Sequence, residues 1–346
     1  MSSPSNPSRR RPSRWPWLIG LAVTVALLAW VLHGISARAV LEHARRADPL
    51  LLVLAVALAT ATFPLRTIRW RLILRDVDGH RFPWVPLWHA TSIGFMANNL
   101  LPARAGEVAR AYVVGRQLPV RFTTALASVG VERVFDGLVM LGLMAVAIGA
   151  PSFPAQTVVG GRSVSALTTT AALLFGGLLL FALVVVHRPV PWLALFGRIV
   201  RRLFPARVAE RLIHWADGIV VGLAVLKSPA RFAGVVLWSL VLWLVNAAAF
   251  AVCFRAFGLA LPLEAALLLQ GIIGFGVAVP STPGFVGVFE AATRVTLAIY
   301  GVDPSLAVSY ALTYHLTTFL PITLLGLWSL SRLHLRLGEL QAPEEE

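Results

Sequence analysis

The chain has 346 residues, of which 58% are hydrophobic and only 13% are charged. Soluble domains carry about 25% charged residues, so this composition, with a mean hydropathy of +0.77, excludes an ordinary soluble protein and indicates a polytopic membrane protein. The formal net charge of +14 does not indicate nucleic-acid binding, because the basic residues lie between hydrophobic segments, where they orient a membrane protein. The single cysteine, Cys253, excludes an intrachain disulfide and a cysteine-based metal cluster.

The chain begins with a basic tail. Residues 1–14 are rich in Ser, Pro and Arg, which predicts a disordered tail at the cytoplasmic membrane surface. The apolar run Trp15–Leu32 that follows is long enough to cross a bilayer. A basic head, an apolar run and small residues also fit a signal peptide over residues 15–39. We favour a membrane span because further spans follow, but the sequence leaves both interpretations open.

The second predicted span, Leu50–Leu65, leads into a strongly basic segment. By the positive-inside rule this segment marks the cytoplasmic side through Arg66, Arg69, Arg71, Arg75 and Arg81.

The stretch NNLLPARAGEVAR, Asn98–Arg110, interrupts the next apolar region. Charged groups at membrane depth are costly and usually face protein or water, so this stretch is a candidate functional site. If the preceding run Val85–Leu101 crossed the membrane completely, all later basic segments would lie outside. We therefore expect a re-entrant hairpin that turns at Pro102–Gly106 and returns through Val108–Val120. Two short full spans satisfy the same charge pattern, but the polarity of the return arm favours the hairpin.

The remaining segments follow in order. Further spans are predicted at Val131–Ala150, Ala166–Val186, Phe232–Phe254 and Leu306–Leu330. The basic loop from His187 to Arg231 has apolar residues near helical spacing and is expected to lie on the inner membrane surface. A second hairpin is predicted to descend with Ala265–Val279, turn at Pro280–Gly284 and return through Gly287–Tyr300.

The expected fold is therefore all-α: about six transmembrane helices and two re-entrant hairpins in one transmembrane domain, residues 15–330. Residues 331–346 form a cytoplasmic tail, both termini are cytoplasmic, and the location is the plasma (inner) membrane.

A weak internal repeat relates residues of about 50–145 to residues of about 235–328. Ile93-Gly94-Phe95 matches Ile273-Gly274-Phe275, and further Gly and Pro residues match at offsets between 178 and 184. The first hairpin enters from the cytoplasm and the second from outside, so the repeat is inverted. Inverted repeats with broken elements near the midplane are typical of alternating-access carriers.

The two interruptions carry the candidate site residues. Glu107 with Arg110, and Glu290 with Arg294, have helical i, i+3 and i, i+4 spacing, so each return arm could hold its own charges together as structural salt bridges. The functional alternative is that the arginines bind an anionic head group through their planar forks, near helix N-termini that favour phosphate. The substrate-path candidates are Asn98, Asn99, Arg104, Glu107, Arg110, Glu132, Arg133, Asp136, Glu290 and Arg294, and the hairpin turns are Pro102, Gly106, Pro280, Pro283, Gly284 and Gly287. The two asparagines fit capping of the broken backbone as well as substrate contact.

No catalytic constellation is evident. His89 and His315 are single imidazoles without a second histidine at ligand spacing, so a metal site is not expected. Asp76-Val77-Asp78 resembles the DxD pair of sugar-nucleotide enzymes, but it is short and lies among arginines. We therefore expect no enzyme activity, no metal and no cofactor.

The chain resembles the flippase-like membrane family whose domain precedes the synthase domain in lysylphosphatidylglycerol synthases. The resemblance rests on NNLLPARAGEVAR, on ERVFD at Glu132–Asp136 and on PSTPGFVGVFE at Pro280–Glu290. It implies movement of a lipid across the bilayer, or a role in envelope lipid pathways. Phe285 stands where a second glycine is expected after Gly284. Only residues 331–346 follow the last predicted span, so we expect no aminoacyl-transfer domain in this sequence, and lipid lysylation is not implied.

Our first hypothesis is a carrier that moves a polar-headed lipid, such as an anionic phospholipid or an aminoacylated or isoprenoid lipid, between leaflets. A membrane-embedded transferase with Asp76, Asp78 or Glu107 as acid or base is the second, and a structural partner of an envelope enzyme is the third. The expected partners are a membrane lipid and the bilayer, with no nucleic acid; an oligomer is possible but not indicated.

Overall fold

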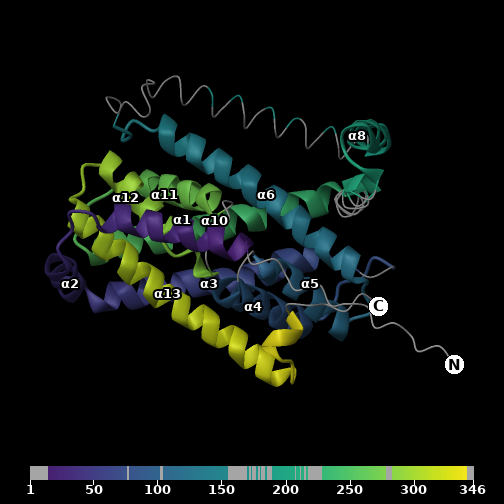
Figure 1. Ribbon diagram of the computed structural model, residues 1–346, viewed down its shortest axis with the longest axis horizontal. Coiled ribbons are helices and arrows are strands. Elements are labelled where there is room, and N and C mark those ends of the chain that lie inside the picture. Colours follow the sequence, from purple (N-terminus) through teal and green to yellow (C-terminus); the bar gives the residue numbers. More distant parts are fainter. Residues whose placement is uncertain are drawn as a thin grey trace.

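The structure, a computed structural model, is built from helices (Figure 1). It describes residues 15–75, 78–101, 104–154, 228–277 and 283–340, most of 189–216, and single positions between 170 and 184. Over these residues the β-structure is one isolated bridge between Arg75 and Arg81. The predicted tail 1–14, the turn prolines Pro102 and Pro280, and almost all of the predicted span Ala166–Val186 lie outside the described residues.

The all-α membrane fold expected from the sequence is confirmed. Among the described residues, three helices are long and apolar enough to cross a membrane: α3 (Pro49–Ile73), α10 (Pro229–Ala256) and α13 (Pro304–Arg332). A fourth candidate is the pair α1 (Trp15–Leu32) and α2 (Ala37–Arg46), which is bent by 80° between its two parts. The total of six spans stays a prediction.

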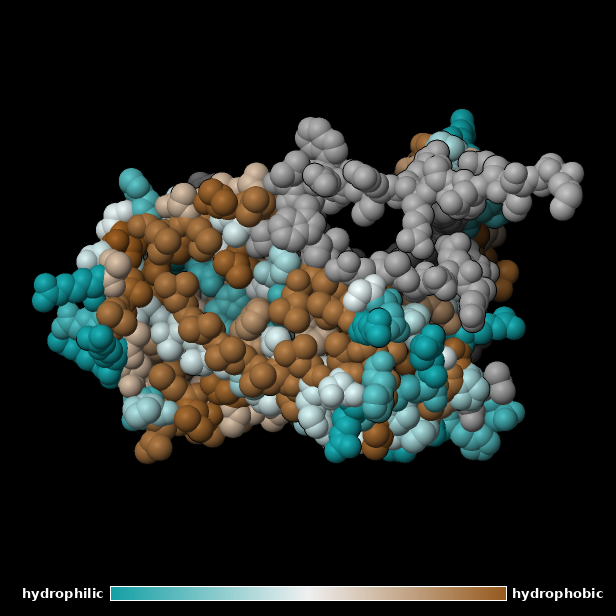
Figure 2. Space-filling view, turned by 60° about the horizontal axis from the view of Figure 1, so that its bottom comes forward, coloured by the Kyte–Doolittle hydropathy of each residue, from teal (hydrophilic) through white to brown (hydrophobic). Residues whose placement is uncertain are grey.

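Surface hydropathy agrees with a membrane environment. Hydrophobic residues cover the middle of the face in Figure 2, with hydrophilic residues gathered toward its ends. Along α13 the exposed leucines recur at helical spacing, at Leu316, Leu320, Leu324 and Leu327. A stripe of this kind at the surface of a membrane protein is suited to lipid contact because it leaves no polar group unsatisfied in hydrocarbon.

Eight of the described helices form two sets of four, which follow one another in the same order along the chain. The first set is α3, α4 (Trp84–Leu100), α5 (Ala105–Gln117) and α6 (Phe122–Gly149). The second is α10, α11 (Leu263–Gly276), α12 (Val288–Ile299) and α13. Each helix of the second set begins 179 to 183 residues after its counterpart.

The contacts between helices are also related by an exchange of the two sets. Helix α3 packs against α10; α4 packs against α5 and α13, as α11 packs against α12 and α6. Each of the two crossings pairs a glycine with a methionine, although the two residues are exchanged between counterpart helices: a β-carbon on Gly326 of α13 would lie 2.1 Å from Met96 of α4, and one on Gly274 of α11 would lie 2.1 Å from Met140 of α6. The contacts between helices are therefore those of an approximate two-fold arrangement.

The two helical hairpins meet at their tips. Helices α4 and α5 lie in one half of the molecule and α11 and α12 in the other (Figure 1). The short 3-10 helix η2 (Pro283–Phe285) at the second tip packs against α4. A β-carbon on Gly284 would lie 2.9 Å from Phe319 and 3.5 Å from the carbonyl oxygen of Asn99. Glycine at this position therefore permits the close approach of the second tip to the first.

Backbone geometry at the tips shows how the turns close. Arg104, the residue before α5, is left-handed with φ of 55°. At the second tip Gly284 (φ 70°), Phe285 (φ 58°) and Gly287 (φ 87°) have positive φ. The phenylalanine that replaces the expected glycine thus adopts a left-handed conformation itself, at the steric cost this imposes on an L-residue.

Four further segments surround the two sets of helices. Helix α1 packs on α12, where the Thr24 hydroxyl donates to the carbonyl of Val286 at 3.1 Å. Helix α2 has no counterpart among the predicted spans. Helix α8 (Pro189–Leu203) carries arginines among exposed apolar residues such as Phe196 and Ile199 and lies at the edge of the molecule in Figure 1. The short 3-10 helix η3 (Leu337–Leu340) near the C-terminus packs against α5.

Candidate functional site

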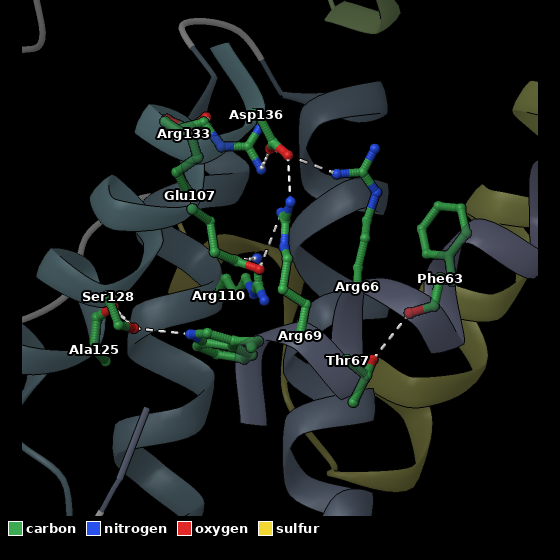
Figure 3. A network of polar contacts seen from close by, with 12 residues as sticks. Phe63, Arg66, Thr67, Arg69, Glu107, Arg110, Ala125, Ser128, Arg133 and Asp136 are labelled. Carbon is green, nitrogen blue, oxygen red and sulfur yellow. Dashed lines mark hydrogen bonds and ion pairs between the residues drawn. The ribbon is translucent and has the colours of Figure 1, made fainter. Parts of the chain in front are cut away.

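A network of charged side chains lies where the return arm of the first hairpin meets α3, α6 and α10 (Figure 3). It joins five arginines to three carboxylates: Arg66, Arg69, Arg104, Arg110, Arg133, Glu107, Glu132 and Asp136. Five of these residues are buried and form its floor: Arg66, Arg69, Arg110, Glu132 and Asp136. Arg104, Glu107 and Arg133 are about one-third exposed and form its rim.

Arg69 lies at the centre of the floor. Its guanidinium is fully buried and binds Asp136 at 2.5 Å, Glu132 at 3.3 Å and the hydroxyl of Ser239 on α10 at 3.0 Å. A buried charge is tolerated only when it is paired and hydrogen-bonded, and Arg69 meets both conditions through three helices. It therefore ties α3 to α6 and α10.

Arg110 brings the first hairpin into the network. Its Nη1 atom donates to Glu132, and its guanidinium stacks over the Trp70 ring at 3.6 Å from the ring centroid. The Trp70 indole is fixed in turn by its donation to the hydroxyl of Ser128 at 2.8 Å. The Nε and Nη2 atoms of Arg110 are buried without a hydrogen-bond partner among the described residues, so part of its planar fork is unsatisfied.

Arg66 forms the opposite edge of the floor. It is 3.8 Å from Asp136 and lies between two rings, at 4.9 Å from the Phe95 centroid and 5.2 Å from the Trp243 centroid. The Trp243 indole also donates to Asp136 at 2.9 Å. The aromatic faces attract the cation and screen it from lipid.

The rim is more loosely held. Arg104 lies 3.1 Å from Glu107, and Arg133 lies 3.3 Å from Asp136 and 4.0 Å from Glu107. Exposed ion pairs of this kind contribute little to stability, so these side chains can exchange one partner for another at small cost.

The charges of the network do not balance. Five arginines face three carboxylates, which leaves an excess of two positive charges in a largely buried region. Within the described residues the buried guanidinium nitrogens without a hydrogen-bond acceptor are Arg66 Nη1, Arg69 Nε, Arg104 Nε, Arg110 Nε and Nη2, and Arg133 Nε; the carboxylate oxygens Glu107 Oε1 and Asp136 Oδ2 also lack a hydrogen-bond donor. The arrangement can therefore accept an anion with several oxygen atoms, such as a phosphate group.

Several sequence interpretations of this region are wrong. Glu107 does not pair with Arg110 on the return arm: Arg110 points to Glu132 of α6, and Glu107 faces Arg104 and Arg133. The predicted span Leu50–Leu65 is too short, because α3 continues to Ile73 and the side chains of Arg66 and Arg69 are buried within it. Their i, i+3 spacing, matched by the i, i+4 spacing of Glu132 and Asp136, was a signal that two charged helix faces meet.

The asparagines of the first hairpin hold backbone and helix contacts. Asn98 accepts a hydrogen bond from the backbone N–H of Gly106 at 2.9 Å, and Asn99 donates to the hydroxyl of Thr323 on α13 at 3.0 Å. A β-carbon on Gly106 would lie 1.8 Å from the carbonyl oxygen of Gly94, so the two arms pack backbone to backbone.

The second hairpin carries a different arrangement. Glu290 is the third residue of α12, as Glu107 is of α5, but its carboxylate accepts from the backbone N–H of Gly287 at 2.6 Å and contacts Nδ1 of His315 at 2.6 Å. The expected pair of Glu290 with Arg294 is wrong. Arg294 instead donates to the carbonyls of Trp30 and Val31 at 2.6 and 2.7 Å and so holds the end of α1.

Among the residues that the structure describes, no group of three or more His, Cys, Asp or Glu side chains is placed to hold a metal ion. His89 is buried in α4 and packs against Trp328 at 5.5 Å between ring centroids.

The family follows from comparison with known proteins. The sequence matches the family described as "Lysylphosphatidylglycerol synthase TM region" over residues 17–326, and the chain belongs to this family. It is 31% identical over 325 residues to a protein of Haloferax volcanii named Glycosyltransferase AglD, an alignment covering 86% of this chain and 51% of that protein. The chain thus spans about half the length of this relative. It is also 25% identical over 325 residues to a UPF0104 membrane protein of Methanothermobacter thermautotrophicus, covering 89% of this chain and 90% of that protein.

Proposed function

We propose that the protein moves a lipid with an anionic head group between the leaflets of a membrane. The observation that carries this proposal is the network of five arginines and three carboxylates inside a membrane fold, with unsatisfied guanidinium nitrogens on its floor and rim. A phosphate group would supply the missing negative charge and the missing acceptors. Membership of a family named for the membrane region of a phospholipid synthase supports a lipid as the source of that phosphate.

The route follows from the two parts of the network. The rim arginines, Arg104 and Arg133, would take the head group first, because they are partly exposed and weakly paired. Arg110 would then offer its free nitrogens from the return arm. The lipid tails would stay in the bilayer, and alternate access would arise from movement of one four-helix set against the other. In this proposal both termini are cytoplasmic and the membrane is the plasma membrane.

The test is transfer of a fluorescent phosphatidylglycerol in proteoliposomes, with quenching of the outer leaflet to count the molecules that have moved. The double variant Arg104→Gln and Arg133→Gln removes the rim charges and leaves the floor intact. We expect its transfer rate to fall by about tenfold or more, since a charge-assisted hydrogen bond contributes about 1.5–3 kcal/mol.

The matched control is the double variant Arg198→Gln and Arg202→Gln on α8, which makes the same charge change at exposed positions outside the network. We expect it to transfer the lipid at the parent rate. A rim variant that transfers the anionic lipid as fast as the parent protein would contradict the proposal. Lipids that copurify with the protein, identified by mass spectrometry, would show which head group binds.

A second candidate is a membrane-embedded transferase that acts on a polyprenyl- or lipid-linked substrate, because the Haloferax relative is named a glycosyltransferase. Of the acids considered for it, Asp76 lies outside the described residues, Asp78 lies in the turn after α3, and Glu107 is paired with arginines on the rim. The Glu107→Gln variant separates the two functions. Loss of product formation with lipid transfer intact would favour the transferase. Loss of lipid transfer with product formation intact would favour the carrier.

A further inference from the structure

A carboxylate and an imidazole face each other at the tip of the second hairpin. Glu290 on α12 is 2% exposed, and its Oε1 atom is 2.6 Å from Nδ1 of His315 on α13. The other ring nitrogen, Nε2, is 2.9 Å from the backbone carbonyl oxygen of Gly284 at the hairpin turn. The ring of Phe289 covers the imidazole at 4.5 Å between centroids. His315 therefore connects α13 to both the return arm and the turn of the hairpin.

The partners of His315 fix how many protons the pair holds. A carbonyl oxygen can only accept, so Nε2 must carry a hydrogen to bind Gly284. Nδ1 then faces a carboxylate oxygen, and this short contact also needs a hydrogen. The hydrogen belongs either to an imidazolium beside an ionised Glu290 or to a protonated Glu290 beside a neutral imidazole. In both cases the observed geometry contains one proton between Nδ1 and Oε1.

Loss of this proton would change the contact from attraction to repulsion. A neutral imidazole that keeps its hydrogen on Nε2 presents a lone pair to a negatively charged oxygen. If the hydrogen moved to Nδ1 instead, the contact with the Gly284 carbonyl would be lost, because two acceptors would then face each other. Either the Glu290 contact or the tether to the turn must therefore break when the pair is deprotonated.

The neighbouring groups on α12, α13, α4 and α1 direct no further charge at the pair. On α12, Arg294 lies one turn further along and is directed to the carbonyls of α1. On α13, Tyr314 stacks on Phe289 at 6.0 Å, away from the carboxylate. At the hairpin tip, α4 brings the neutral carbonyl of Asn99 to Gly284, and α1 brings the neutral hydroxyl of Thr24 to Val286. The change of charge when the proton is lost is thus confined to Glu290 and His315.

We propose that Glu290 and His315 form a proton-binding site that locks the second hairpin tip against the first. The bound proton holds Gly284 to α13, and Gly284 is the residue that approaches Asn99 of the first hairpin. Proton release breaks one of these two contacts and so loosens the tip. Coupling of this step to lipid movement rests on the proposed function, whereas the proton site itself does not. A proton gradient would then be the energy source for transfer.

The experiment measures exposure of the tip, with no lipid substrate needed. A cysteine at the exposed position Val286 is labelled with a membrane-impermeant maleimide from about pH 5 to about pH 8, and native Cys253 is buried. The same cysteine is placed in the Glu290→Gln variant. In this variant the side-chain amide at position 290 can donate to Nδ1 of His315 and accept from the N–H of Gly287. The amide therefore reproduces the protonated geometry but cannot lose the proton. Ionisation of the thiol raises the labelling rates of both proteins alike. The ratio of the two rates therefore reports the loss of the proton from the Glu290–His315 pair.

We expect the ratio of the two rates to be near one at low pH and to rise by up to tenfold per pH unit once the pair loses its proton. The control His89→Gln removes the other buried imidazole described here and should leave the ratio unchanged. A ratio that stays at one over the whole range overturns the proposal. So does a ¹⁵N spectrum at neutral pH in which Nδ1 of His315 carries no hydrogen and accepts none. Failure of lipid transfer with a pH-dependent ratio would instead count against the proposed function alone.

Discussion

The two hairpins have the same helical plan but different chemistry. In the first, the return arm directs Arg110 inward to Glu132 and Trp70, within a network that has more arginines than carboxylates. In the second, the return arm directs Glu290 to one imidazole and sends Arg294 outward to α1. A shared fold thus places an arginine-rich network on one side of the molecular centre and a single carboxylate–imidazole contact on the other.

The difference suggests a division of labour between the two halves. An excess of buried positive charge is stable only while an anion or a counter-charge is present, so the first hairpin is suited to binding. A carboxylate–imidazole pair has no net charge with its proton in place, so the second hairpin is suited to switching. The predictions below test whether the two halves differ in this way.

The largest effect is expected from neutralising the centre of the first network. In Arg69→Met, Asp136 and Glu132 lose their shared buried partner, and breaking such a pair costs about 3–5 kcal/mol. The free energy of unfolding, measured by denaturant titration in detergent, should fall by that amount.

The matched variant in the second hairpin is Glu290→Gln, which also removes one buried charge. Its amide can keep both hydrogen bonds, so we expect a loss below about 1.5 kcal/mol. Equal losses for the two variants would show that the hairpins are held by the same kind of interaction.

A smaller effect is expected at the backbone contact inside the first hairpin. In Gly106→Ala the new β-carbon would lie 1.8 Å from the Gly94 carbonyl oxygen, so the arms must separate, at about 1–3 kcal/mol. The melting temperature should fall, and exchange of amide hydrogens with deuterium should rise in α4 and α5 before α11 and α12.

The control for this variant is Gly137→Ala on α6, where nothing lies within 4 Å of the added carbon. It should be neutral or slightly stabilising, because alanine favours helix. If both variants behaved alike, close packing of the first hairpin would be disproved.

Much of the fold is predictable from the sequence because hydrophobic runs, Pro and Gly breaks and charge parity act locally. The return arms expected from Val108 and Gly287 correspond to α5 and α12. The polar contacts are less predictable, because helix spacing suggests partners on the same helix, whereas Arg110 and Glu290 find theirs on α6 and α13. The end of the second span was also missed at Arg69, because an arginine after an apolar run suggests a loop, whereas Arg69 is buried inside α3 by its partners on α6.

A local effect, confined to one helix, is expected at Arg294, which the second hairpin directs outward to α1. In Arg294→Gln the two hydrogen bonds from the guanidinium to the Trp30 and Val31 carbonyls are weakened, and the contact of the cation with the Trp30 ring, at 4.9 Å, is lost. We expect a loss of about 1–2 kcal/mol, confined to the docking of α1. Deuterium exchange should rise in α1 and stay unchanged in α4 and α5. The control Arg255→Gln, at the exposed end of α10, removes the same charge without a contact to α1 and should leave exchange there unchanged. Faster exchange in the first hairpin of Arg294→Gln would mean that Arg294 supports the arginine network, and the separation between a binding half and a switching half would then fail.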